Sequence, residues 1–179
     1  MSTATQPAVT AEFALGMREF FLQNLEKEMN TTSRVVQAIP AAKSSWRPDP
    51  KAKTALELAW HIVTVDVLFT EYIAKGSFEK MMEEEKELNS KIPKTPDEIV
   101  VYYKKNFPAA MERVRAMSPN QLLTPIDFMG AFKMPAFTYL SFINNHTIHH
   151  RGQLSTYLRP MGSKVPSIYG PSGDEEWKG

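Results

Sequence analysis

The four histidines of this chain are unevenly distributed, and their spacing suggests a metal site. His146, His149 and His150 lie close together near the C-terminus, whereas His61 stands alone far upstream. On an α-helix each residue advances by about 100°, so His146 and His150 project from one face, one turn apart. Two such imidazoles can hold one divalent cation, with His61 available as a third ligand from elsewhere in the fold. Three neutral imidazoles with an open position are typical of a catalytic zinc or nickel site rather than a closed structural one.

A simpler interpretation of these histidines stays open beside the metal site. Two helix histidines spaced four apart are more often satisfied by hydrogen bonds in a core than by a metal, and a lone histidine on a buried helix is usually a core residue. The combination of His61, His146 and His150 is what favours the metal. His149 lies about 100° around the helix from His150, so we expect it to face a flank or solvent.

Other polar residues near the histidines could serve the same site. Glu57 lies one turn before His61 and could act as an acceptor or a general base, although its place in a capping box also explains it. Asp66 lies in an apolar run, where an unpaired carboxylate is costly to bury, so we expect it to face solvent or to pair with a cation such as Arg151. Arg151 and Gln153 could orient groups behind the ligands, because ligating histidines usually donate a hydrogen bond from their other ring nitrogen.

Composition excludes several classes of protein. The chain has 179 residues, 42% hydrophobic and 23% charged, which is typical of one globular domain. No apolar run of about 18 residues could cross a membrane, and residues 1–12 lack the pattern of a secretory signal, so we expect a cytoplasmic protein. The absence of cysteine leaves only nitrogen and oxygen ligands for a metal. A net charge of +1 argues against nucleic acid as a partner.

Periodic apolar residues and helix signals predict a mostly helical chain. The stretch 54–57 is a capping box before an apolar run, and Gly76 can end that helix. The stretch 95–98 combines an N-cap, a proline and a glutamate at the start of another helix, which Pro108 should kink or divide. We expect long helices over about residues 10–39, 54–75, 95–117 and 135–159, a loop or short exposed helix without assigned function over 79–87, a short capped turn from Ser118, and an irregular stretch through Gly130.

The last long helix carries its histidines on an otherwise apolar face. His146 and His150 share the core-facing stripe with Tyr139 and Tyr157, which we expect mainly in the core, although they could line a pocket. His61 lies on the most apolar of the expected helices, which should be the most buried one. We expect a single domain over residues 1–179, with a flexible N-terminus over 1–9 and an irregular tail over 161–179 that lies across the bundle.

The run His150-Arg151-Gly152-Gln153 on the fourth long helix, with a lone histidine on the second, makes the chain resemble the DinB-like (DinB/YfiT-like) superfamily. The resemblance spans most of the chain and is most specific from His146 to Gly162. It implies an all-α fold, an antiparallel four-helix bundle with a long crossover, often found as a homodimer. It also implies a divalent metal held by three histidines, which carried over position by position are His61, His146 and His150.

The resemblance also implies an enzyme, although the activities of its members differ. Characterised relatives include thiol-dependent transferases and isomerases that use bacillithiol, mycothiol or glutathione, while most members are called metal-dependent hydrolases. We therefore expect a metal-dependent enzyme that holds zinc or nickel and carries out thiol-dependent transfer on a small-molecule substrate. The alternatives are a metal-dependent hydrolase, and a stress protein that binds a metal or small ligand without turnover. Catalytic and cofactor-binding residues beyond the metal ligands stay unassigned, and no membrane partner is expected.

Overall fold

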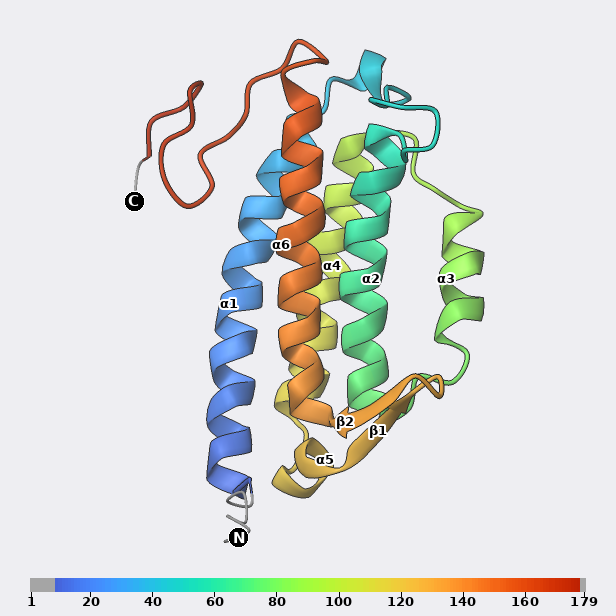
Figure 1. The fold of residues 1–179 in the computed structure, drawn as a ribbon, viewed down its shortest axis with the longest axis vertical. Helices are drawn as coiled ribbons and strands as arrows, with labels where there is room; N and C mark the ends of the chain where they lie inside the picture. The colour runs from blue at the N-terminus through green and yellow to red at the C-terminus, as the bar shows by residue number, and fades with distance from the viewer. Residues whose placement is uncertain (1–8, 178–179) are drawn as a thin grey trace, which may run out of the picture.

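Four long helices form the body of the molecule in the computed structural model, which describes residues 9–177 (Figure 1). They are α1 (Ala11–Gln37), α2 (Ala55–Lys75), α4 (Pro96–Arg115) and α6 (Tyr139–Leu158). Helix α2 packs against α4 and α6, and α1 packs against the same two helices, so the four enclose one core. The predicted four-helix bundle is therefore confirmed. The expected flexible N-terminus, 1–9, lies outside the described residues except for Val9.

A long crossover between α2 and α4 sets the directions of the helices. It contains the short helix α3 (Met81–Asn89), which stands beside α2 at the edge of the bundle (Figure 1). Because the chain returns along the bundle through this crossover, α2 and α4 run in the same direction, opposite to α1 and α6 (Figure 1). Helices α2 and α6 are thus antiparallel neighbours, and the first half of α2 lies beside the second half of α6.

Side-chain caps explain where the central helices begin and end. At the start of α2, the Thr54 N–H donates to the Glu57 carboxylate at 2.8 Å, and the Glu57 N–H donates to the Thr54 hydroxyl at 3.2 Å. The same capping box, formed by Thr95 and Glu98, starts α4. Helix α2 ends at Gly76, whose φ of 72° favours glycine because it has no Cβ. Both predicted capping boxes and the predicted stop are confirmed.

Pro108 lies inside α4, and the helix continues through it as one element. Of the two outcomes predicted for this proline, division of the helix is therefore wrong. A proline removes one backbone hydrogen bond from the helix interior. Phe107 and Met111, on either side of it, are buried in the core, and this packing holds the two halves in one helix.

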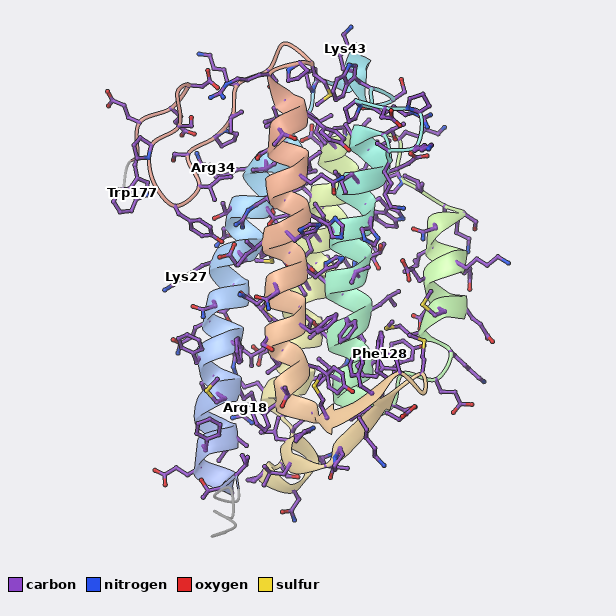
Figure 2. All side chains as sticks on the ribbon, viewed as in Figure 1. Arg18, Lys27, Arg34, Lys43, Phe128 and Trp177 are labelled. Carbon is purple, nitrogen blue, oxygen red and sulfur yellow. The ribbon has the colours of Figure 1, made fainter. Side chains whose placement is uncertain are left out.

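The segment between α4 and α6 contains a small hairpin, so the prediction of an irregular stretch through Gly130 is wrong. The predicted capped turn from Ser118 is confirmed as α5 (Pro119–Leu123). Two antiparallel strands follow, β1 (Pro125–Phe128) and β2 (Phe132–Pro135), and then the 3₁₀ helix η2 (Ala136–Thr138). Strands of four residues with a proline at each outer end are too short to show an alternating pattern. Phe128 anchors the hairpin in an aromatic cluster beneath α2, against Phe69 and Phe78 (Figure 2).

The described part of the C-terminal segment has no regular structure and lies alongside α1 (Figure 1). Arg34 reaches from α1 to this tail, where its guanidinium contacts both carboxylate oxygens of Glu175 at 2.6 Å and the carbonyl of Ser167 at 3.1 Å (Figure 2). The other connection at this end, between α1 and α2, contains the 3₁₀ helix η1 (Ala41–Lys43). Within residues 9–177, no helix is both long enough and apolar enough to cross a bilayer.

Candidate metal centre

The fold brings His61, His146 and His150 together between α2 and α6. His61 lies in the second turn of α2, and the other two lie one turn apart on α6. The ring centroids are 5.0 Å apart for His61 and His146, 4.7 Å for His61 and His150, and 4.5 Å for His146 and His150. One nitrogen from each ring lies within 4.8 Å of the others, so the three side chains could hold one metal ion. Each of them is partly exposed, which gives the cluster access to solvent.

The nitrogen geometry fits a metal with histidine ligands. The Nε2 atoms of His61 and His146 are 3.2 Å apart. Two nitrogens that bind zinc at 2.0–2.1 Å, separated by a tetrahedral angle, would lie about 3.3 Å from each other. His150 uses its Nδ1 to contact the Gln153 side-chain oxygen at 3.1 Å, which leaves its Nε2 for the same site. The three rings can therefore present one Nε2 each to a single ion.

A buried carboxylate stands behind His146. Asp66, on α2, is fully buried, and its Oδ1 lies 3.5 Å from the Nδ1 of His146. That nitrogen is buried and makes no hydrogen bond within residues 9–177. The carboxylate itself accepts hydrogen bonds from the hydroxyls of Thr147, at 2.8 Å, and Tyr103, at 2.5 Å. A small rotation of the imidazole would join it to Asp66, the kind of carboxylate contact that orients metal-binding histidines.

Glu85 takes the corresponding place behind His61, and the sequence analysis missed it. Its Oε1 lies 3.9 Å from the Nδ1 of His61, although Glu85 belongs to the acidic segment to which no function was assigned. The spacing of apolar residues along this segment could have placed Glu85 on the buried side of a helix. Met81, Glu85 and Leu88 repeat at steps of four and three, and all three are at least partly buried on the exposed helix α3. Gln153, predicted as a possible orienting residue, does contact His150.

The surroundings keep two of the imidazoles neutral, as a metal site requires. The pKa of His61 is lowered to about 3, mainly by burial and then by the proximity of His146, His150 and Lys53. Burial is also the main cause that lowers the pKa of His150, although the Gln153 contact opposes this shift. At neutral pH these rings therefore carry lone pairs rather than charges, and lone pairs are what a divalent ion binds.

Two of the weaker candidates lie near the site without joining it. His149 is exposed on α6, as predicted, and only its ring edge approaches His150, with centroids 4.7 Å apart. The Glu57 carboxylate is held in the capping box, where the Thr54 backbone N–H is the main cause that lowers its pKa. Tyr139 and Tyr157 are buried in the core and do not line an open pocket beside the histidines.

The suggested pairing of Asp66 with Arg151 is wrong. Arg151 follows His150 by one residue and therefore points about 100° away from it, toward α1. There its guanidinium, which is 1% exposed, pairs with the Glu28 carboxylate. The Tyr169 hydroxyl from the tail accepts from Arg151 at 2.6 Å and donates to Glu28 at 2.8 Å. Asp66 instead obtains its partners from hydroxyl groups and from His146.

Sequence comparison places the chain in a family. A family model described as the DinB family matches residues 1–178. The chain belongs to the DinB family. Among its relatives, YrdA of Bacillus subtilis strain 168 is 26% identical over 160 residues, which cover 89% of this chain and 91% of YrdA. YjoA of the same strain is 27% identical over 142 residues, covering 78% and 88% of the two chains. Both relatives carry the description uncharacterized protein.

Crystal structures of other DinB-like proteins share the fold. A DinB-like protein from Bacillus cereus ATCC 10987 is 28% identical, with a TM-score of 0.69 over 84% of this chain and 97% of that one. The structure of YjoA from Bacillus subtilis gives a TM-score of 0.67 over 83% of this chain and 96% of that one, at 23% identity. The predicted membership of the DinB family and its mostly helical fold are thus confirmed.

Proposed function

We propose that this DinB-family protein is a metal-dependent enzyme in which His61, His146 and His150 hold a divalent ion, zinc or nickel. The observation that carries the proposal is the orientation of the three rings. An oxygen acceptor lies behind the Nδ1 of each ring, while the Nε2 atoms of His61 and His146 face each other at 3.2 Å. One hydrogen bond could join the Nε2 atoms of His61 and His146, but it would not account for a nitrogen of a third imidazole within 4.8 Å of both. Within residues 9–177 no fourth protein ligand joins the group, which is typical of catalytic rather than structural sites.

A thiol is the substrate group that suits this site best. When bound, the metal supplies Lewis acidity, which lowers the pKa of a coordinated thiol or water toward neutrality. The protein supplies the rest through side chains whose roles are fixed by their contacts. Gln153 contacts the His150 ring, and Asp66 would hold the His146 ring after a small rotation of the imidazole. Partial burial of the site strengthens its electrostatic interactions.

The carboxylates around the site favour thiol transfer over hydrolysis. Activation of water benefits from a free carboxylate that can take a proton. Asp66 is fully buried and accepts two hydroxyl hydrogen bonds, and Glu57 is bound to its helix N-terminus. Glu85 lies behind the Nδ1 of His61, on the side of the ring opposite the Nε2 that faces the cluster. A thiol can lose its proton without a general base more readily than water, because its pKa of about 8.5 is far closer to neutrality. In such a transfer the thiol loses its proton, sulfur uses its electron pair to bond to an electrophilic carbon, and the leaving group departs with the electrons of the broken bond.

Metal analysis of the purified protein tests the first part of the proposal. We expect about one divalent ion per chain before any chelator is added, and a loss of that ion in His61→Gln and His146→Gln. His149→Gln is the matched control, since His149 is exposed on the same helix and should leave the metal content unchanged. Metal-free wild-type protein, or equal metal content in His61→Gln and His149→Gln, would contradict the proposal.

A panel of low-molecular-weight thiols tests the second part. Each thiol is mixed with an electrophilic acceptor and the metal-loaded protein, and thiol consumption is followed with and without a chelator. We expect at least one thiol to be consumed in a metal-dependent way. If the metal is present but no thiol is consumed, thiol transfer is excluded. The hydrolase and the non-catalytic binding protein then become the leading candidates.

A further inference from the structure

A cationic pocket opens next to His61. It has a volume of about 320 Å³ and lies between the connection that precedes α2, the first turns of α2 and the end of α3. Its polar lining consists of Arg47, Lys51, Lys53, Glu57, His61 and Asn89. Two larger pockets, of about 520 and 460 Å³, lie between α2 and α4 and beside the hairpin, and neither contains a histidine. The small pocket therefore shares His61 with the candidate metal centre.

The charges of this pocket are unbalanced. Arg47, Lys51 and Lys53 contribute three positive charges, and none of them forms an ion pair within residues 9–177. Glu57 is the acidic residue of the lining, and its carboxylate already accepts the Thr54 N–H at 2.8 Å. The lining thus carries a net charge of +2, three cations minus one carboxylate, while the whole chain carries +1. A concave cluster of unpaired cations attracts anions more strongly than scattered surface lysines do.

We propose that this pocket binds an anionic group of the substrate, a carboxylate or a phosphate, and so places the substrate's reacting atom at the three histidines. The inference rests on the proposed function, because it names the substrate class of the same site. Arg47 and Lys53 would contact the anion, since charge-assisted hydrogen bonds from guanidinium and ammonium groups recognise oxyanions. The pocket volume is at the lower end of the range for small-molecule sites, so the substrate is a small molecule rather than a polymer segment.

Metal-free protein tests the anion site without any contribution from a metal. Chelator-treated protein is titrated with succinate and, separately, with inorganic phosphate, and binding is followed by NMR shifts of the backbone amides of residues 47–61. We expect saturable shifts with at least one of the two anions, and roughly tenfold weaker binding in the double variant Arg47→Gln/Lys53→Gln. Lys43→Gln is the matched control, because Lys43 is exposed on the same connection and points away from the bundle (Figure 2). Equal binding by the double variant and the wild type would overturn the inference.

Metal-loaded protein tests whether the anion directs a thiol to the site. Cobalt-loaded protein is titrated with mercaptosuccinate, which carries two carboxylates, and with the neutral 1-thioglycerol, and the thiolate-to-cobalt absorption band reports binding. We expect mercaptosuccinate to bind roughly tenfold more tightly, and the preference to vanish in the double variant and in about 1 M salt. Equal affinity of the two thiols in the wild type would overturn the inference.

The two experiments separate failure of this inference from failure of the proposed function. If the wild-type protein binds cobalt and binds the charged and neutral thiols equally well, the metal site is supported and the anion site is excluded. Wild-type protein that binds no cobalt would exclude the proposed metal-dependent function. The titration of metal-free protein would then decide by itself whether the pocket binds anions.

Discussion

A histidine that binds a metal uses both ring nitrogens, one for the ion and one for a partner that fixes the ring. The site described here supplies partners of different strength to its three rings. His146 has a buried carboxylate within 3.5 Å, His150 has the Gln153 amide oxygen at 3.1 Å, and His61 has a partly exposed carboxylate at 3.9 Å. Asp66 is the most firmly held of these acceptors. Burial raises the pKa of Tyr103, so its hydroxyl keeps its proton and donates to Asp66.

Replacement of Asp66 by asparagine should therefore weaken metal binding without unfolding the protein. The amide keeps the shape of the carboxylate, but it carries no charge and cannot accept from Thr147, Tyr103 and His146 at once. We expect the metal affinity of Asp66→Asn to fall by about tenfold to a hundredfold, measured by competition with a chromophoric chelator. Asp97→Asn, the same change at an exposed site in the first turn of α4, serves as the control. If both variants bind metal as the wild type does, Asp66 does not orient His146.

The sequence was sufficient to predict which three histidines come together, but not all of the groups that lie behind them. His146 and His150 are separated by one helical turn, so local geometry alone places them together. His61 was suggested because it is the remaining histidine, and the family resemblance supported that choice, since no local rule connects positions on two helices. Asp66 was visible as a polar residue in an apolar run, but its partners come from α4 and α6 and depend on how those helices pack. The position of Glu85 behind His61 depends on the path of the crossover that contains α3, which no local pattern predicts.

At the scale of elements, the segment after His146 serves two interfaces of α6. His150 faces α2 and the metal centre, whereas Arg151 faces α1 and enters the buried contact with Glu28. The Tyr169 hydroxyl, from the C-terminal tail, hydrogen-bonds to Arg151 in this contact. The ion pair of Arg34 with Glu175 attaches the tail to α1 at a second point. This arrangement fixes the rotation of α6 about its axis. A small rotation would both separate Arg151 from Glu28 and move His150 out of the metal centre.

Removal of the Glu28 carboxylate should destabilise the whole bundle. Glu28→Gln leaves the buried Arg151 guanidinium without its counter-charge, and an uncompensated buried charge costs about 3 kcal/mol or more. We expect the free energy of unfolding in urea to fall by about that amount. Glu26→Gln is the control from the same helix, because Glu26 pairs with Arg115 at the surface and its loss should cost less than about 1 kcal/mol. Equal losses in the two variants would show that the buried pair contributes no more than a surface one.

The elements that were predicted correctly are those whose signals are local. Thr54, Thr95 and Ser118 each start a helix through contacts with a residue three positions later, so a short stretch of sequence contains the whole signal. The hairpin is different, because its strands are held by long-range packing of Phe128 against Phe69 and Phe78. The continuity of α4 through Pro108 likewise depends on core contacts that local rules do not include.

At the scale of the whole molecule, protonation of the three-histidine cluster costs stability when no metal is bound. Three imidazoles face each other between two packed helices, and protonation of more than one of them would bring positive charges close together. Burial lowers the pKa of His61 to about 3, with the neighbouring histidines as the next cause. Its ordinary value is 6.5, so the unfolded chain binds this proton more readily than the folded chain does. Protonation of His61 therefore favours unfolding.

The metal-free protein should accordingly lose stability in mild acid, and His61 should be a main cause. The contribution of His61 is complete above pH 6.5 and is lost as the pH falls from 6.5 toward 3. One such proton gives a slope of at most about 1.4 kcal/mol per pH unit. The measurement is the free energy of unfolding of chelator-treated protein in urea, at several pH values between about 7 and 4.5. His61→Gln removes the titrating ring, so its stability should fall less steeply than that of the wild type over this range. Parallel curves for the two proteins would show that His61 is protonated as easily in the folded state as in the unfolded chain. The three rings would then not form the partly buried cluster that the proposed metal site requires.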